Sequence, residues 1–289
     1  MKKAYEIAQE MVRDQLEQKN PEAVKDLESI NESDILITEG EYDFIEKVLS
    51  NAGTPHTLIQ GERLEDASLR PDQVLFVNCP GNFEPRALRK MESFVKEGGF
   101  LFTTDWALKN VLEEAFPGYV EQGGNNTADE VVRVEILDKE DPYLNSLIGP
   151  DDDPQWWLEG SSYPIRVIDR DAVKVLITSK EIEKRYGESP VLITFKYGKG
   201  TIYHMISHFY LQRSETRTKR HRKSGMDYVS ESDVSPALYS KYKEMGAEKE
   251  DLGDIESAYW SSAVMNRVVL EKKQRLREGQ IKKEKATLE

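Results

Sequence analysis

The feature that most constrains the fold is a regular alternation of short apolar runs and amphipathic segments between residues 34 and 116. Apolar runs this short, separated by segments with a helical period, are typical of strands that alternate with helices. That alternation predicts a parallel sheet with helices on both faces. The predicted strands lie at 34–40, 56–59, 73–82 and 100–105, and the predicted helices at 42–53, 85–99 and 107–116.

Strands dominate the second half of the chain, and helical patterns occupy both ends. The strands predicted there lie at 131–137, 163–168, 172–178, 190–198 and 200–209, and the helices at 3 to about 30, at 235–246 and at 253 to about 285. Gly198-Lys199-Gly200 separates the last two strands and is typical of a tight hairpin. The order of elements predicts an α/β fold with helical extensions at its two termini.

The charge of the chain and its single cysteine exclude several classes of protein. A net charge of −13 disfavours general binding to nucleic acid, because phosphate backbones carry the same sign. No apolar stretch approaches the roughly 20 residues that cross a bilayer. The opening MKKAYEIAQEMVRDQ lacks the apolar centre of a signal peptide. Cys79 alone permits neither an internal disulfide nor a Cys-x-x-Cys zinc motif. We therefore expect a cytoplasmic protein that does not bind membranes.

Residues 213–223 form a concentrated basic run, with six Lys or Arg against one Glu. We interpret the run as a solvated loop that compensates the acidic remainder of the chain. The alternative is a contact with nucleic acid or with an acidic protein surface. The run contains no interleaved aromatic residues for stacking on bases, so nucleic acid is not the expected partner.

Small and polar residues follow three of the predicted strands. Glu39 follows the first strand, Gly81 and Asn82 follow the third, and Asp105 and Trp106 follow the fourth. Ligands of parallel sheets bind in the crevice outside the carboxyl ends of the strands. The sequence therefore predicts that these five residues line a ligand crevice.

Three segments between residue 34 and about residue 210 resemble the class I glutamine amidotransferase-like superfamily. VLFVNCPGN (74–82) resembles the strand and turn that help to build the oxyanion hole, GGFLFTTDWALKNVLEEAFPG (98–118) resembles the nucleophile elbow with its helix, and GKGTIYHMISHF (198–209) resembles the hairpin that delivers the catalytic histidine. The non-amidotransferase branches, such as the ThuA-like proteins and the related domain of intraflagellar transport proteins, are the most similar in character. The resemblance implies a flavodoxin-like parallel sheet in an α/β domain at 33–211, with an N-terminal helical extension at 1–32 and a basic loop with C-terminal helices at 212–289.

The departures from the family pattern bear on activity. Alignment on EEAFPG places Trp106, or Asp105 after a shift of one residue, where active members have their nucleophilic cysteine. His208 is followed by Phe209-Tyr210 in place of the family's Pro-Glu. Acyl transfer from glutamine cannot proceed without a nucleophile and an oriented base. The sequence therefore favours a protein without this activity, and it implies no cofactor.

Several residues remain candidates for other chemistry, and each has a structural alternative. Asp105 is either a helix N-cap or a general base and ligand anchor. Cys79 is either a small buried hydrophobe or a thiol that His208 activates.

Glu159 is the acidic candidate in PQWWLEGSSYPI (154–165). Trp156 and Trp157 in the same segment either clamp a flat ligand or seat the loop on the core.

A metal site is the last candidate. His204 and His208 lie four residues apart on a predicted strand and share a face, because side chains alternate along a strand. A zinc ion held by this pair needs a third ligand such as Asp105 or Glu39. The alternative is that one histidine packs among apolar side chains and the other binds a polar partner.

Two functional hypotheses follow from the sequence. The first is a non-catalytic, amidotransferase-like binding or scaffold module whose helical ends contact a protein partner or a second copy. The second is a hydrolase of altered chemistry that acts on a small polar or sugar-like substrate. It would use His208 with Asp105 or Glu159, or a metal ion held by the histidines.

Overall fold

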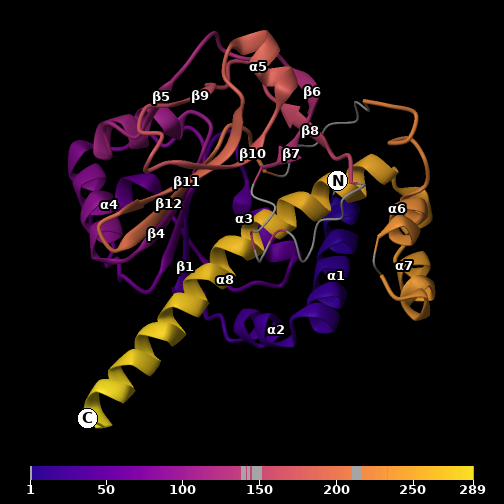
Figure 1. The fold of residues 1–289 in the computed structure, drawn as a ribbon, viewed down its shortest axis with the longest axis horizontal. Coiled ribbons are helices and arrows are strands. Elements are labelled where there is room, and N and C mark those ends of the chain that lie inside the picture. Colours follow the sequence, from indigo (N-terminus) through magenta and orange to yellow (C-terminus); the bar gives the residue numbers. More distant parts are fainter. Residues whose placement is uncertain are drawn as a thin grey trace.

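An eight-stranded sheet forms the centre of the protein (Figure 1). The computed structural model describes residues 2–137, 141, 144, 152–209, 217–232 and 234–288, with side chains to residue 282. In spatial order the strands are β2 (Thr57–Ile59), β1 (Ile35–Thr38), β3 (Val74–Val77), β4 (Phe100–Thr104), β12 (Gly200–Met205), β11 (Pro190–Tyr197), β10 (Lys174–Thr178) and β7 (Glu135–Ile136). The first five are parallel, and β11, β10 and β7 follow as antiparallel neighbours. Numbered along the chain, the parallel strands have the flavodoxin-like order 2-1-3-4-5. The predicted fold class is therefore confirmed.

Helices cover both faces of this sheet. One face carries α4 (Pro85–Glu97) and the helical segment after β4, which is π-helical over Leu108–Glu113. The other face carries α3 (Ile45–Asn51) and α8 (Leu252–Leu288). The helix α1 (Lys2–Lys19) packs against these two helices. The remaining helices are α2 (Pro21–Glu28), α5 (Lys180–Tyr186), α6 (Gly225–Glu231) and α7 (Tyr239–Glu244). None of the helices in the described part of the chain has an apolar stretch suited to crossing a bilayer.

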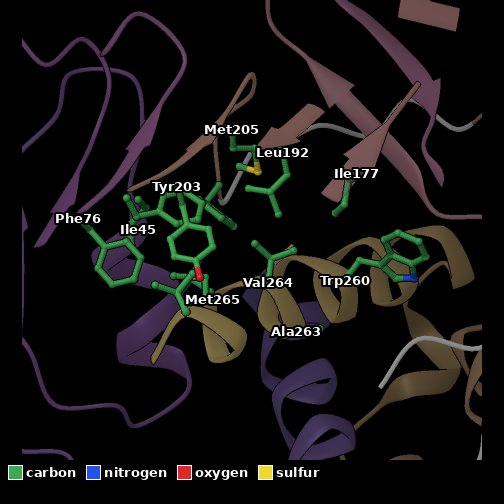
Figure 2. Close-up of a cluster of buried hydrophobic side chains, with 14 of the residues drawn as sticks. Ile45, Phe76, Ile177, Leu192, Tyr203, Met205, Trp260, Ala263, Val264 and Met265 are labelled. Atoms are coloured by element: carbon green, nitrogen blue, oxygen red, sulfur yellow. The ribbon is translucent and has the colours of Figure 1, made fainter. Parts of the chain in front are cut away.

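The main core lies between the sheet and α8. Figure 2 shows Val264 and Met265 of α8 facing the side chains of Tyr203 and Leu192 from the sheet. The buried side chains of α1, the sheet and α8 belong to one hydrophobic cluster. The division of the chain into three parts at residues 33 and 212 stays a prediction.

Several strands differ from the prediction. The run at 131–137 is divided between β6 (Glu130–Arg133) and β7, which belong to different sheets. β6 pairs with β8 (Gln155–Leu158), and β5 (Val120–Gln122) pairs with β9 (Ile165–Val167). No local pattern predicts β5 or β8, because such short strands depend on partners far away in the sequence. The strand predicted at 200–209 ends at Met205, so His208 lies beyond it.

The basic run is not simply a solvated loop. Residues 213–216 lie outside the described residues. The Arg217 side chain is 21% exposed and forms ion pairs with Asp153 at 3.1 Å and Glu181 at 3.2 Å. Arg220 forms ion pairs at 2.8 Å with Glu256 and with Glu231. Acidic side chains of the fold itself therefore match part of this positive charge.

Candidate functional site

Buried polar side chains meet at the carboxyl ends of the parallel strands. Asp43 lies in the loop after β1, Cys79 in the turn after β3, Asp105 directly after β4, and His208 shortly after β12. These four strands are neighbours in the sheet, so the residues that follow them converge. We call these four residues, together with Glu159 after β8, the carboxyl-end cluster.

His208 is the centre of this cluster. Its Nε2 atom lies 3.0 Å from Asp105 Oδ2, and its Nδ1 atom lies 2.8 Å from Glu159 Oε2. Cys79 Sγ lies 4.0 Å from the same Asp105 oxygen. The distances from the ring nitrogens are those of ion pairs, but neither nitrogen makes a hydrogen bond of good geometry. The imidazole is therefore held between two carboxylates without being fully satisfied by them.

Asp105 has a left-handed backbone conformation at the turn between β4 and the following helix, where the sequence resemblance predicts a nucleophile elbow. Its φ is +44°, in the left-handed region that non-glycine residues other than Asn and Asp seldom adopt. Its carboxylate accepts hydrogen bonds from Ser162 Oγ at 2.9 Å and from Tyr163 N at 3.1 Å. The π-helical segment has Ala107 as its N-cap and no side-chain cap, and the hydrogen bonds of the Asp105 carboxylate come instead from Ser162 and Tyr163. Asp105 rather than Trp106 has the positive φ of this turn.

The turn after β3 packs closely on the elbow. Gly81 has a φ of +68°, and a Cβ atom there would lie 2.9 Å from the Cβ of Ala107. Only glycine fits both the backbone conformation and the space. The peptide before Pro80 is cis, and the Cys79 N–H donates to Thr104 Oγ1 at 3.1 Å. These contacts fix the Cys79 side chain beside Asp105.

Burial and neighbouring charges set the protonation of the cluster. Burial by itself lowers the pKa of His208, but the surrounding carboxylates and the Cys79 thiol raise this pKa well above its ordinary value. Burial raises the pKa of the Cys79 thiol, and His208 opposes this only in part. Burial also raises the pKa of Asp43 to about 6. Near neutral pH the cluster therefore contains an imidazolium and an un-ionised thiol.

Aromatic rings cover the cluster. The Trp106 ring stacks on Tyr163 with a centroid distance of 5.9 Å and meets the Tyr42 ring at 5.5 Å. The Trp106 Nε1–H donates to the carbonyl oxygen of Ser161 at 2.8 Å. The Asp105 and His208 side chains are each only 3% exposed. The elbow residue is therefore covered by side chains and does not line an open crevice.

Trp156 and Trp157 are both buried in β8, in agreement with their interpretation as core residues. The Trp156 Nε1–H donates to Ser207 Oγ, next to His208. The cavity that these rings share with His208 has a volume of about 20 Å³. That volume holds roughly one water molecule and is too small for a sugar ring.

The other predicted residues lie outside the cluster. Glu39 and Asn82 are exposed. His204 is buried in β12, with its Nδ1 atom 2.8 Å from Thr103 Oγ1, and burial lowers its pKa to about 3. Within the described residues, the group whose atoms lie close enough to share a metal ion is Cys79, Asp105 and His208. The structure therefore does not bring His204 and Glu39 into a metal site with His208.

Three residues of the site, Asp43, Ser162 and Tyr163, were not predicted from the sequence. Asp43 Oδ1 accepts hydrogen bonds from Phe44 N at 2.8 Å and Phe209 N at 2.9 Å. Asp43 follows the first strand, so the rule that selected Glu39 and Asp105 also applies to it. Ser162 and Tyr163 bind Asp105 from 57 and 58 residues away, and no local pattern reveals contacts of that kind.

Comparisons with known proteins give similarities of structure only. No protein-family model matches the chain, and no curated protein is similar to it in sequence. A ThuA-like protein from Bacteroides uniformis is similar over 62% of this chain and 82% of its own, with 14% identity and a TM-score of 0.42. A cytoplasmic protein from Salmonella typhimurium is similar over 75% of this chain and 99% of its own, with 14% identity and a TM-score of 0.41.

An exo-β-1,4-mannosidase from Opitutaceae bacterium strain TAV5 is a third similar structure. It has 9% identity and a TM-score of 0.42, and the similarity covers 79% of this chain. The chain spans only 35% of the length of the mannosidase. The α/β fold assigned above rests on the order of the strands in this chain and not on these scores.

Proposed function

We propose that this protein is a non-catalytic binding or scaffold module built on an amidotransferase-like α/β fold. The observation that carries the proposal is the state of Asp105 at the elbow. Its carboxylate is buried and already binds His208, Ser162 and Tyr163. A nucleophile must be exposed to its substrate, and this side chain is not.

The thiol of Cys79 does not replace the missing nucleophile. It lies after β3 instead of at the elbow, it is fully buried, and burial raises its pKa. A catalytic cysteine needs the opposite, namely a lowered pKa and access to substrate. His208, which could serve as a base, is held between Asp105 and Glu159. These features support a role in binding over one in acyl transfer.

We assign the protein contact to the end of α8. In Figure 1 this helix extends beyond the rest of the protein toward the C-terminus. Its side chains are buried up to Leu270 and exposed from Arg277 to Lys282, including Ile281 at 49% exposure. Short helical segments without tertiary contacts are only marginally stable in water. Residues 277–285 hold four Lys or Arg against two Glu, so an acidic protein surface is the partner that fits.

Covalent labelling tests the absence of glutamine chemistry. The folded protein is incubated with a glutamine-mimicking electrophile, and labelling of Cys79 is followed by mass spectrometry. We expect no labelling of the folded chain, because the thiol is buried and un-ionised. The positive control is labelling of Cys79 by a neutral thiol reagent in urea. Stoichiometric reaction of the folded protein with the glutamine mimic would sink the proposal.

Truncation tests the assigned surface. A chain that ends at Leu276 retains the buried part of α8 and should unfold at the same urea concentration as the full chain. We expect it to lose association, either with a second copy in sedimentation or with a purified acidic partner. Asp105→Asn is the matched variant that should keep the association. The opposite pattern, in which only Asp105→Asn loses it, would contradict the assignment.

A hydrolase of altered chemistry is the second candidate, and one observation favours it. The structure brings His208 into contact with both Asp105 and Glu159, which are the acid and base candidates of the sequence analysis. Hydrolysis of activated esters or aryl glycosides that disappears in both Asp105→Asn and His208→Gln would favour this candidate. Burial of both side chains under Trp106 and Tyr163 supports the binding module instead.

A further inference from the structure

We propose that Cys79, Asp105 and His208 form a site for one zinc ion that ties together the loops after β3, β4 and β12. The site goes beyond the binding role proposed above and does not depend on it. The sequence suggested a metal site held by His204 and His208. The proposed site keeps His208 but has Cys79 in place of His204, which lies outside the carboxyl-end cluster.

The geometry of the three side chains fits a tetrahedral metal. Cys79 Sγ, one Asp105 oxygen and one His208 nitrogen all lie within 4.8 Å of one another. The Asp105 oxygen is 4.0 Å from the sulfur and 3.0 Å from His208 Nε2. With zinc–ligand bonds of about 2.0–2.3 Å, tetrahedral ligands lie roughly 3.3–3.8 Å apart. The separation between Cys79 Sγ and the His208 nitrogen is at most 4.8 Å, so shifts of no more than about an ångström bring the three ligands to tetrahedral spacing.

The ligand types select the metal. Thiolate sulfur, imidazole nitrogen and carboxylate oxygen are the three protein ligands that zinc uses. Magnesium and calcium prefer sites made of oxygen alone, so the sulfur of Cys79 disfavours them. The ligands follow the ends of three adjacent strands of the sheet.

A second layer of contacts orients the ligands as in known zinc sites. The Glu159 carboxylate lies 2.8 Å from His208 Nδ1, at ion-pair distance but without a hydrogen bond of good geometry, and Nε2 is the nitrogen next to Asp105 Oδ2. A carboxylate on the far nitrogen of a zinc-binding histidine fixes its tautomer and ring orientation. Asp105 is held in turn by Ser162 Oγ and Tyr163 N. Two of the three proposed ligands, His208 and Asp105, are therefore contacted by further polar groups that can orient them.

The surroundings of the buried His208 side chain point to a ligand. Its side chain is 3% exposed, yet its Nε2 atom makes no hydrogen bond of good geometry. Buried polar atoms in proteins are nearly always hydrogen-bonded, and exceptions call for an explanation such as an ion. Asp43 and Asp105 add two buried carboxylates around this one imidazole. A divalent cation would satisfy the nitrogen and balance the negative charge.

Cobalt substitution tests the site in the full chain. Cys79 is the single cysteine, so thiolate-to-cobalt charge-transfer absorption identifies it without a variant. Protein stripped with a chelator is titrated with Co²⁺ and then with Zn²⁺. We expect the absorption to saturate at one Co²⁺ per chain and to vanish when Zn²⁺ displaces it. A folded chain that shows no such absorption and takes up no Zn²⁺ would overturn the proposal.

Variants then separate ligands from supports. Cys79→Ser should abolish the charge-transfer absorption, whereas Glu159→Gln should keep it and weaken Zn²⁺ binding by about 10–100-fold. His56→Gln is the control, because His56 hydrogen-bonds to Thr54 far from the cluster and should change nothing. Circular dichroism checks that each variant folds. Unchanged absorption in Cys79→Ser would contradict the ligand set, and unchanged affinity in Glu159→Gln would contradict the support. Neither result would bear on the α8 contact.

Discussion

Two buried charged clusters contain residues of β12 or of the loop after it, and they are satisfied to different degrees. The first is the α8 network, which consists of Arg267, Glu271, Tyr203 and Asp141. Arg267 lies 2.6 Å and 2.8 Å from Asp141 Oδ2 through two of its nitrogens. It also donates to the Tyr203 hydroxyl at 2.7 Å and lies 3.1 Å from Glu271. In this network the cation is surrounded by well-placed acceptors.

The carboxyl-end cluster is the second, and it lacks this balance. Three carboxylates, those of Asp43, Asp105 and Glu159, surround the single imidazole of His208. Asp43 Oδ2 is buried without a hydrogen-bond partner, and the His208 nitrogens are poorly satisfied. Natural proteins satisfy buried polar groups unless function requires otherwise. We therefore expect the α8 network to contribute more to the stability of the fold than the carboxyl-end cluster, for which we have proposed a zinc ion.

The largest expected effect is the loss of the α8 network. Arg267→Met should lower the free energy of unfolding by about 3–5 kcal/mol, because it removes the cation that lies 2.6 Å from the buried Asp141 carboxylate. Urea unfolding measures the change. Arg277→Met is the matched control: Arg277 pairs with Asp26 at 2.9 Å but is 45% exposed, so a loss below about 1 kcal/mol is expected. Equal losses of unfolding free energy in the two variants would show that the α8 network stabilises the fold no more than an exposed ion pair does.

The next effect concerns acid stability through His204, which belongs to neither cluster. Its pKa in the folded state is about 3, against about 6.5 in the unfolded chain. The unfolded state therefore binds an extra proton below pH 6.5, and stability falls as the pH is lowered toward 3. The contribution is about 1.4 kcal/mol per pH unit, or roughly 3 kcal/mol at pH 4.5.

His204→Gln removes this titration and leaves the two clusters unchanged. Urea unfolding at several pH values between 7 and 4 should show a shallower loss of stability in the variant. The difference in slope between the two proteins is the quantity to compare, because it cancels the titration of all other groups. Parallel pH profiles would show that His204 is not held neutral in the folded protein.

The smallest effect is expected at the elbow. In chelator-treated protein Asp105→Asn should cost about 1 kcal/mol or less, because asparagine tolerates the left-handed conformation and its Oδ1 still accepts from Tyr163 N. The Ser162 hydroxyl, which donates to the other oxygen of Asp105, can turn to accept from the Asn Nδ2–H instead. Asp105→Val should cost about 1–3 kcal/mol more through backbone strain. Thermal or urea unfolding measures both. A loss in Asp105→Asn as large as that in Arg267→Met would mean that the cluster stabilises the fold after all.

The sequence predicted those parts of the fold that depend on local periodicity. The strands and helices between residues 34 and 105 lie within a few residues of their predicted positions, because apolar spacing records which face of an element is buried. The rule that ligands meet strands at their carboxyl ends selected Asp105, but it also selected Glu39 and Asn82, which are exposed. Attention to His208 came from the resemblance of residues 198–209 to a catalytic hairpin, and Cys79 was a candidate as the single thiol of the chain.

The sequence by itself thus determined the α/β order and the absence of a cysteine from the turn after β4. Only the tertiary structure showed that His208 lies beyond the end of β12 and that Glu159, which follows β8, lies next to His208. It also showed that Ser162 donates a hydrogen bond to Asp105. The physical reason is the range of the interactions. Periodicity reports the environment of one element, whereas this cluster is assembled from loops that meet only after the sheet has formed.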